Sequence, residues 1–548
     1  MRLIVVGGVA GGATAAARAR RLSEDAEIIV FERGEHVSFA NCGLPYYVGQ
    51  EIVERESLLL ETPESLHARY RLDVRARTEV LAIERAEHCV RARDLESGRE
   101  YTERYDRLIL SPGAAPIRPP LPGIEHPRIF SLRTVPDSDK IKAMVDGGAR
   151  RAVVVGGGFI GLEMAENLRR RGLEVALVEL LDQVMPPFDK EMVTPVHEEL
   201  RSHGVALHLA DAVAEFEDEQ DGLTAVLESG TRLPADLVVL SIGVRPETSL
   251  AAEAGLEIGP RGGIHVDDDM RTSDPDIYAV GDAVEVRDCV VGGTALIPLA
   301  GPANRQGRIA ADRVFGRESE YHGTQGTSIV RVFGLTLALT GASEKTLTRV
   351  GHAHEKVYIH PMQHAGYYPG AERLAIKLLF SPADGKVLGA QIAGQEGVDK
   401  RIDVLATAIR AGMSVYDLEE LELAYAPPFG SAKDPINMAG FVAANVLKGD
   451  TEIIHADALE QVEGELIDVR DPDEHSEGHI PGSRNVPVDD LRDRLDELPT
   501  DRPLVVYCQI GLRGYVAERI LRQRGYTVRN LSGGFNTYRG YFAEATRS

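Results

Sequence analysis

Two of the four cysteines are placed where a thiol can act as a nucleophile. Cys42 lies in SFANCGLP (residues 38–45), shortly after a glycine-rich turn, and this segment holds no second cysteine. A lone thiol that exchanges electrons must do so by bonding to something outside the chain. Cys508 begins CQIGLR (508–513) after an apolar run. Cys89 and Cys289 lie in polar, hairpin-like stretches and are interpreted as structural, and no CxxC spacing suggests a metal site.

The segment before Cys42 predicts a dinucleotide site. LIVV (3–6) is typical of a buried parallel strand, GGVAGG (7–12) of a tight turn, and residues 13–22 of a helix. Small residues let the backbone approach a pyrophosphate at a helix N-terminus, and Glu32, after the strand over 27–31, can accept hydrogen bonds from an adenosine ribose. The third position of this turn, which is usually glycine in dinucleotide-binding turns, is Val9. The residues predicted here are Gly7, Gly8, Gly11, Gly12 and Glu32.

A second and stricter copy of this pattern is AVVVGGGFIG (152–161), and Glu179 closes its next strand over 174–178. A single glycine-rich turn is often only a packing turn, whereas two copies in full context indicate two dinucleotides. If the dinucleotide at this turn carries nicotinamide, Glu179 would face the 2′-phosphate of NADPH with like charge, so NADH is favoured and NADPH stays possible. The residues predicted at this site are Gly156, Gly158, Phe159, Ile160, Gly161, Glu179 and Gly243.

The order of apolar strands divides the chain into four α/β or α+β domains. The first is expected over 1–115 and 244–322, and the others over 116–243, 323–447 and 453–548. The return to the first domain rests on IYAVGDA (277–283), whose carboxylate can bind the ribityl chain of a flavin, and on a helix opened by PLAG (298–301). Further residues expected around this first cofactor are Arg33, Asn41, Ser111, Gly113, Gly281, Asp282, Pro298 and Ala300.

Composition describes a globular multidomain protein of 548 residues, 43% hydrophobic and 27% charged. The net charge of −24 argues against nucleic acid or an anionic membrane as a partner. An acidic ligand would need a local basic cluster such as Arg18, Arg20, Arg21 and Arg33, and a solvated helix face explains these arginines equally well. The first strand begins at residue 3, and no apolar run approaches the roughly 18 residues of a membrane span, so we expect a cytoplasmic protein.

The C-terminal residues predict a separate sulfur chemistry. LIDVRDP (466–472), GHIPGSRNVP (478–487), the strand over 504–507 and a helix over 515–524 form a new α/β pattern. A cysteine between a strand end and a helix N-terminus faces converging N–H groups, which stabilise a thiolate or persulfide, and Arg513 adds positive charge. A tyrosine phosphatase loop needs a longer spacing than the four residues between Cys508 and Arg513. A purely structural Cys508 is the remaining alternative.

With these motifs identified, residues 1 to about 445 resemble the pyridine nucleotide-disulfide oxidoreductases, in particular the coenzyme A disulfide reductase and NADH oxidase branch. The resemblance rests on both nucleotide turns, SFANCGLPYY (38–47) with its single cysteine, AVGD (279–282) and YAPPF (425–429). The C-terminal segment resembles a single rhodanese domain, including LSGGF (531–535). The implied fold is α/β, with two Rossmann-like FAD and NAD(P) domains, an α+β dimerisation domain and a rhodanese domain.

The same resemblance implies FAD in the first site, a nicotinamide cofactor in the second, and a homodimer whose interface domain completes the partner's active site. Tyr367 and Tyr425 match two tyrosines that approach the redox cysteine of the other subunit in coenzyme A disulfide reductases, and ordinary interface aromatics are the alternative. Coenzyme A, or another small carrier of sulfane sulfur, is the implied substrate. The residues expected to contact coenzyme A are Arg18, Arg21, Ser38, Asn41 and Arg305.

Three functions from different classes follow. The first is NAD(P)H-dependent reduction of coenzyme A persulfide, polysulfide or coenzyme A disulfide through a mixed disulfide at Cys42, with sulfur transfer at Cys508. The second is an NADH oxidase that uses a sulfenic acid at Cys42. The third is a sulfur carrier or redox sensor. The rhodanese-like segment favours the first function over the second, and two complete nucleotide sites disfavour the third.

Overall fold

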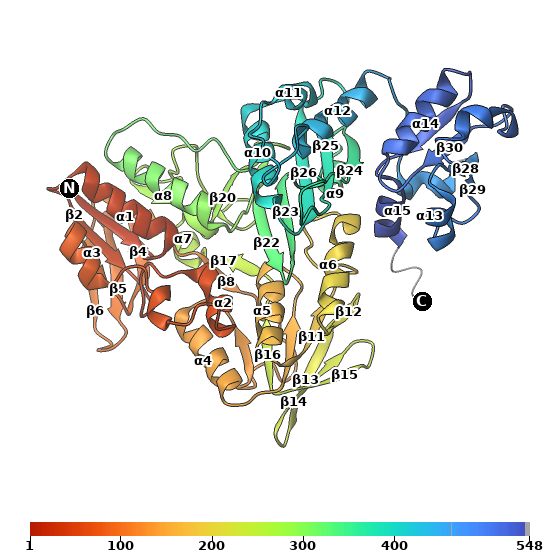
Figure 1. Ribbon diagram of the computed structural model, residues 1–548. Coiled ribbons are helices and arrows are strands. Elements are labelled where there is room, and N and C mark those ends of the chain that lie inside the picture. Colours follow the sequence, from red (N-terminus) through yellow and green to blue (C-terminus); the bar gives the residue numbers. More distant parts are fainter. Residues whose placement is uncertain (462, 543–548) are drawn as a thin grey trace. The chain divides into compact units, whose positions relative to one another are not determined.

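The computed structural model describes residues 1–461 and 463–542 (Figure 1). The chain forms two compact units. One unit consists of Met1–Asp182 and His203–Gly326, and the other of Gln183–Ser202 and Thr327–Ser548. Residues 462 and 543–548 of the expected C-terminal domain lie outside the described residues. Within the described part of the chain, no helix is long and apolar enough to cross a membrane.

The first sheet of unit one is parallel, with strand order β19-β7-β1-β2-β3. Its strands are β1 (Arg2–Val6), β2 (Glu27–Phe31), β3 (Asp73–Arg75), β7 (Arg107–Leu110) and β19 (Ile277–Ala279). Apolar runs such as Leu3–Val5 are fully buried, as in parallel sheets covered on both faces. Helix α1 (Ala10–Leu22) packs against α8 (Ala300–Val314), so the chain after β19 stays with this sheet (Figure 1).

The second sheet of unit one repeats this plan, with parallel order β12-β11-β10-β16-β9. Its strands are β9 (Ile129–Ser131), β10 (Arg151–Val155), β11 (Glu174–Glu179), β12 (Val205–Leu209) and β16 (Leu237–Leu240). Helix α5 (Phe159–Arg170) follows β10 and packs on β10, β11 and β16. Helix α2 (Leu44–Val48), next to Cys42, packs against α4 (Val135–Asp146) and α5.

Smaller elements complete unit one. Two antiparallel sheets are β4 (Thr78–Glu84), β5 (Cys89–Asp94) and β6 (Glu100–Arg104), and β13 (Val213–Glu219), β14 (Gly222–Leu227) and β15 (Arg232–Ala235). The remaining elements are α3 (Pro63–Tyr70), α7 (Ser249–Glu253), β8 (Ala114–Pro116), β17 (Val244–Pro246), β18 (Ile264–His265), β20 (Val284–Arg287) and β21 (Thr294–Ala295). Cys89 is buried on β5, whereas Cys289 is exposed after β20.

Unit two contains an antiparallel sheet of order β22-β23-β26-β25-β24. Its strands are β22 (Ser328–Val332), β23 (Leu335–Gly341), β24 (Glu355–Ile359), β25 (Ala375–Phe380) and β26 (Val387–Gly394). The helices of this part are α6 (Lys190–Ser202), α9 (Glu344–Arg349), α10 (Val398–Ala411), α11 (Val415–Glu420) and α12 (Pro435–Leu447). Helix α10 packs on β23 and β26, and α12 packs on β24 and β25.

The C-terminal part of unit two is a parallel sheet of order β27-β31-β30-β28-β29. Its strands are β27 (Ile453–Ile454), β28 (Glu465–Asp468), β29 (Arg484–Asn485), β30 (Leu504–Tyr507) and β31 (Val528–Leu531), and its helices are α13 (Pro472–Glu477), α14 (Leu512–Arg522) and α15 (Gly534–Phe542). Helix α14 begins before the expected residue 515, so Arg513 lies in its first turn.

Candidate active sites

The carboxyl ends of β1, β7 and β19 meet at the first glycine-rich turn. Gly7 has φ +97°, and a Cβ there would lie 2.0 Å from Ser111 O, so the turn requires glycine. A Cβ on Gly11 would lie 3.2 Å from Ser111 Oγ, and Gly281 N donates to Gln306 Oε1 at 2.8 Å. The structure thus brings together four residues predicted from the sequence. Gln306 of α8 supports them without having been predicted.

The two acidic residues at the strand ends are held in the same way. Glu32 Oε2 accepts a hydrogen bond from Gly8 N at 2.8 Å, and Glu179 Oε2 accepts one from Gly157 N at 2.7 Å. Glu179 Oε1 also accepts from Leu181 N at 2.9 Å. These N–H groups fix each carboxylate beside its turn, and each oxygen keeps a lone pair for a ribose hydroxyl. The two turns therefore hold their acidic residues in equivalent arrangements.

The backbone conformation explains why valine can replace the usual glycine at position 9. Val9 precedes α1 with φ −105° and ψ −169°, and Gly158 precedes α5 with nearly the same backbone angles, φ −78° and ψ −170°. This extended conformation is open to any residue, so glycine is not required here. Both helices lack a side-chain cap and an acidic residue in the first turn. Their N–H groups and positive dipole ends suit a pyrophosphate.

Cys42 lies in the 3₁₀ turn η1 (Asn41–Gly43), directly before α2. Its side chain reaches the surface, but the protein around the sulfur desolvates it enough to raise the pKa of the thiol. The carboxylates of Glu163 and Asp282 raise this pKa further. The residues of this chain alone therefore favour the thiol over the thiolate. The pKa of Asp282 is itself raised by burial.

Glu163 on α5 was not predicted from the sequence. Burial raises its pKa to about 7, while a hydrogen bond from Tyr46 Oη to Glu163 Oε1, at 3.2 Å, acts in the opposite direction. A carboxyl group that titrates near neutrality and interacts with a nucleophile is a candidate proton acceptor. The signal in the sequence was a carboxylate directly after the second fingerprint, two positions beyond Gly161.

The arginines expected to bind phosphates have different surroundings. Arg18 Nη2 lies 2.7 Å from Asp312 Oδ1, and both side chains are largely buried. Arg21 and Arg305 are exposed. An anion would have to compete with Asp312 for Arg18, so Arg21 and Arg305 are better placed for a phosphate.

The other predicted residues of unit one lie in loops, turns and the start of α8. Arg33 pairs with Glu247 at 3.1 Å, and Asn41 is exposed beside Cys42. Pro298 and Ala300 lie at the N-terminal end of α8. Positive φ angles of 45°, 75° and 112° are found at Ser38, Gly113 and Gly243.

Cys508 lies at the end of β30 and is 1% exposed. Its Sγ accepts a hydrogen bond from Gly511 N at 3.2 Å. Gly511, with φ +97°, turns the chain into α14 so that this N–H faces the sulfur. Backbone N–H groups aimed at a sulfur atom stabilise a thiolate or persulfide anion.

The LSGGF segment (531–535), on which the resemblance to a rhodanese domain partly rests, packs directly against the Cys508 loop. A Cβ on Gly534 would lie 2.3 Å from Cys508 O and 2.8 Å from Gly511 N, so a larger residue does not fit there. Phe535 N donates to Cys508 O at 2.8 Å. The segment therefore shapes the loop that holds the nucleophile.

Two arginines flank this loop, and only one of them was predicted. Arg513 donates to both oxygens of Glu474 at 2.7 Å, so its charge is largely neutralised in this state. Arg470 is buried, pairs with Asp468 at 2.7 Å, and donates from Nη1 to Gln509 Oε1 at 2.9 Å. Arg470 thus supports the loop from within the core, a role that depends on neighbours far away in the sequence.

Tyr367 and Tyr425 come from separate loops of unit two, and their hydroxyl groups form a hydrogen bond of 3.0 Å. Tyr367 is 77% exposed, Tyr425 48%, and the nearby Phe429 in the YAPPF segment 72%. Large aromatic side chains gathered at a surface are typical of an interaction site.

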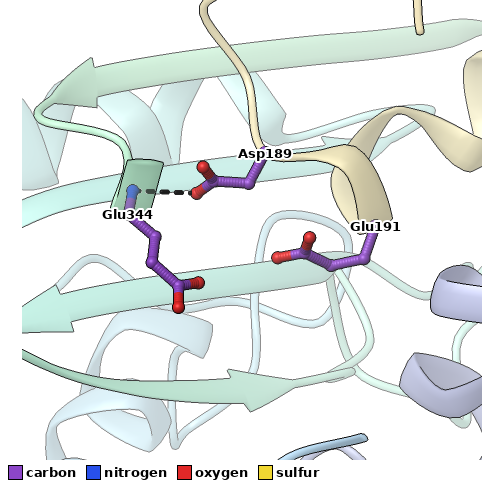
Figure 2. Close-up of side chains that lie close together, drawn as sticks. All are labelled: Asp189, Glu191 and Glu344. Carbon is purple, nitrogen blue, oxygen red and sulfur yellow. Dashed lines mark hydrogen bonds between the residues drawn. The ribbon is translucent and has the colours of Figure 1, made fainter. Parts of the chain in front are cut away.

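Asp189, Glu191 and Glu344 bring three carboxylates together, with oxygens within 4.8 Å of one another (Figure 2). Such a group can bind a cation, and here the cation is the ammonium of Lys377. Its Nζ lies 2.8, 2.6 and 2.6 Å from the three carboxylates, and its side chain is fully buried. Against the effect of burial, Lys377 and Lys356 lower the pKa of Glu344 to about 2. The cluster is therefore an internal ion network.

Tyr358 on β24 connects the antiparallel sheet to the C-terminal domain. Its N–H donates to Ser532 Oγ at 3.2 Å, and its hydroxyl bonds to Glu191 Oε1 at 2.7 Å and to Tyr541 Oη at 2.8 Å. Ser532 belongs to the segment that shapes the Cys508 loop. The loop is therefore supported from outside its own domain.

Comparison with known proteins gives close matches over most of the chain. The coenzyme A disulfide reductase of Staphylococcus haemolyticus is 35% identical over 447 residues, covering 81% of this chain and 100% of that protein. The crystal structure of reduced CoADR-RHD from Bacillus anthracis is 51% identical, with a TM-score of 0.97 and coverage of 99% and 98%. A NAD-dependent persulfide reductase from A. fulgidus is 38% identical, with a TM-score of 0.93 and coverage of 98% and 100%.

Residues 1–307 match the pyridine nucleotide-disulphide oxidoreductase family, 327–434 match the dimerisation domain of that family, and 454–540 match the rhodanese-like domain. These matches confirm the expected fold class, and the family implies the use of FAD and NAD(P)H. The chain therefore belongs to the pyridine nucleotide-disulphide oxidoreductases and carries a rhodanese-like domain near its C-terminus.

Proposed function

We propose that this chain reduces coenzyme A disulfide and coenzyme A persulfide or polysulfide with NAD(P)H at Cys42, and transfers sulfane sulfur at Cys508. One observation carries this proposal: the same chain holds a lone cysteine after the first of two glycine-rich nucleotide turns, and a second, free cysteine whose sulfur faces a backbone N–H group. The similar proteins named above are a coenzyme A disulfide reductase and a persulfide reductase, which both act on sulfur–sulfur bonds.

The residues present fit both cofactors. FAD would use the first turn with Glu32 and Asp282, and NADH the second turn with Glu179. The supporting observations are the close-packed glycines, the helix N-termini without acidic residues, and the two carboxylates fixed by backbone N–H groups. When bound, these cofactors supply a pair of electrons to a disulfide at Cys42.

In the proposed reduction, Cys42 is the nucleophile that breaks the sulfur–sulfur bond of the substrate. Its thiolate attacks the coenzyme A sulfur of the persulfide, the S–S bond breaks, hydrosulfide leaves, and a Cys42–S–S–CoA mixed disulfide forms. An electron pair and a proton then convert this disulfide to the Cys42 thiolate and free coenzyme A thiol. The sum is NADH, a proton and coenzyme A persulfide giving NAD⁺, coenzyme A and hydrogen sulfide. With coenzyme A disulfide, the leaving group is coenzyme A thiolate.

Coenzyme A would contact positively charged side chains at its phosphate end and neutral polar side chains at its pantetheine end. Arg21 and Arg305 are the exposed candidates for its phosphates, with Arg18 available if Asp312 releases it. Ser38 and Asn41 would orient the pantetheine end beside Cys42.

A homodimer would bring Tyr367 and Tyr425 to the Cys42 of the partner subunit, which agrees with the match of residues 327–434 to a dimerisation domain. Tyr425 would hydrogen-bond or protonate the thiolate that leaves.

A second candidate function is an NADH oxidase that cycles Cys42 through a sulfenic acid. The exposure of Cys42 favours it, because an oxidant can reach the sulfur. Mass spectrometry of the Cys42 peptide from the isolated protein separates the two functions. A coenzyme A adduct on Cys42 supports the reductase, whereas a sulfenic acid supports the oxidase.

Two matched serine variants test the assignment of the nucleophiles. Cys42→Ser should abolish NADH-dependent persulfide reduction and leave flavin bound, because the thiol does not hold the cofactor. Cys508→Ser should abolish sulfur transfer but spare reduction of a preformed small persulfide. A Cys42→Ser protein that kept most of its persulfide turnover would disprove the mixed disulfide.

A further inference from the structure

The two loops that carry Tyr367 and Tyr425 are each closed by local hydrogen bonds. In the first loop, Gln363 N donates to Glu372 O at 2.9 Å and Gln363 Nε2 donates to Gly370 O at 2.9 Å. Tyr367 lies at the tip of the segment that these bonds enclose. The first loop is therefore fixed at its base by Gln363.

The second loop ends at helix α12. Asp434 caps this helix through a hydrogen bond from Ile436 N to its Oδ1 at 3.0 Å. One turn later, Asn437 Nδ2 donates to the carbonyls of Leu418 and Leu421, at 3.0 and 2.9 Å, and so fixes the chain before the loop. The loop with Tyr425 is thus held at both ends by α12.

A single buried guanidinium joins the two loops. Arg401 of α10 is 1% exposed, and its Nη2 donates both to Gln363 O at 2.7 Å and to Asp434 Oδ2 at 3.0 Å. Gly397, one helical turn earlier, leaves room for this side chain, since a Cβ there would lie 2.4 Å from Arg401 Nη1.

We propose that Arg401 is a positioning residue that aligns Tyr367 and Tyr425 for the disulfide step, by binding the bases of both tyrosine loops through one nitrogen. The inference rests on the proposed function for the role of the tyrosines, and on the observed contacts for the alignment itself. Arg401 acts through the tyrosine pair and has no contact of its own with the reacting sulfur in this assignment.

The test uses the double variant Arg401→Met/Asp434→Asn, which removes the guanidinium without leaving an unpaired buried carboxylate. Arg410→Met, an exposed arginine of the same helix, is the matched control. We expect turnover of coenzyme A disulfide to fall about ten- to a hundredfold, as for a small misplacement of catalytic groups. Reduction of the bound flavin by NADH, measured without disulfide, should be unchanged.

Two further measurements separate alignment from general structural damage. First, Tyr425→Phe added to the double variant should cause no further loss of turnover, because both changes disrupt the same pair. Second, the hydrogen bond with Tyr425 raises the pKa of Tyr367 above its usual value. With 3-fluorotyrosine at position 367, fluorine NMR should show this pKa falling in the double variant to its value in Tyr425→Phe.

The possible failures appear in different measurements. An unchanged Tyr367 pKa together with normal turnover in the folded double variant would overturn the positioning role of Arg401. Normal turnover in Tyr425→Phe alone would instead refute the role that the proposed function gives to the tyrosines. Additive losses from the double variant and Tyr425→Phe would show that Arg401 acts elsewhere.

Discussion

Replacing Lys377 with methionine removes the ammonium that three buried carboxylates share. Its Nζ lies 2.8 Å from Asp189, 2.6 Å from Glu191 and 2.6 Å from Glu344. Methionine keeps most of the apolar stem, so the change removes charge with little change in packing. The three carboxylates are then left facing one another, with Lys356 as a neighbour of Glu344.

The size of the effect follows from the pKa of Glu344, which the two lysines lower from 4.5 to about 2. At about 1.4 kcal/mol per pH unit, this lowering corresponds to about 3–4 kcal/mol of stability at neutral pH. Removing one partner of a buried ion pair typically costs about 3–5 kcal/mol. We therefore expect Lys377→Met to reduce the free energy of unfolding by about 3–5 kcal/mol at pH 7.

The pH dependence gives a second signature. A carboxyl group with a lowered pKa in the folded state contributes stability above its unfolded pKa, and this stability is lost as the pH falls through the folded pKa of about 2. The contribution of Glu344 to native stability should thus be constant between about pH 8 and about pH 5. In Lys377→Met, the three neighbouring carboxylates take up protons over this range, which relieves their mutual repulsion. The loss of unfolding free energy relative to the native protein should therefore be smaller at about pH 5 than at about pH 8.

Urea unfolding followed by circular dichroism at both pH values measures these changes. Lys448→Met is the control, because it removes an exposed pair with Glu419 in the same unit and should cost less than about 1 kcal/mol. A loss below about 1 kcal/mol for Lys377→Met, or a loss that grows as the pH falls, would refute the ion-network interpretation.

Three further predictions concern the proposed active sites. The native enzyme should prefer NADH over NADPH by about five- to a hundredfold in kcat/KM, and Glu179→Ala should narrow this preference; equal efficiency with both cofactors would contradict the proposed contact. Glu163→Gln should lower the pKa of Cys42, because it removes a nearby negative charge, and the pH dependence of thiol alkylation measures this; an unchanged pKa would show that the carboxylate does not act on the thiol. Subunit exchange between Cys42→Ser and Tyr425→Phe proteins should restore part of the activity, since one site of the heterodimer is intact; no recovery in proven heterodimers would argue against a tyrosine contributed by the partner.

Strands and nucleotide turns could be predicted because their signals are local. The apolar runs over 3–6, 152–155 and 504–507 lie within β1, β10 and β30. The helices after the glycine-rich turn and after Cys508 begin earlier than expected, at Ala10 and Leu512. Glycine-rich segments carry no apolar periodicity that could mark the first helical residue, and helix ends are the least defined part of such patterns.

Side-chain roles that depend on distant partners could not be predicted. Arg18 was assigned to phosphate binding from its charge, but Asp312, 294 residues away, pairs with it. Arg470 lies in a motif that the sequence did identify, yet its contact with Gln509 exists only in the folded domain. The segment Gln183–Ser202 was grouped by sequence order with the second nucleotide domain, whereas its residues Asp189 and Glu191 belong to the ion network of unit two.

The contact between Tyr358 and Ser532 has a consequence for solubility as well as for sulfur transfer. β24 is an outer strand of its antiparallel sheet, and outer strands offer unpaired backbone groups as templates for aggregation. Here a loop of the C-terminal domain takes one such N–H group. The rhodanese-like domain thereby covers part of this edge strand. A chain shortened before β27 would expose the edge of β24, and two copies could then pair their β24 strands.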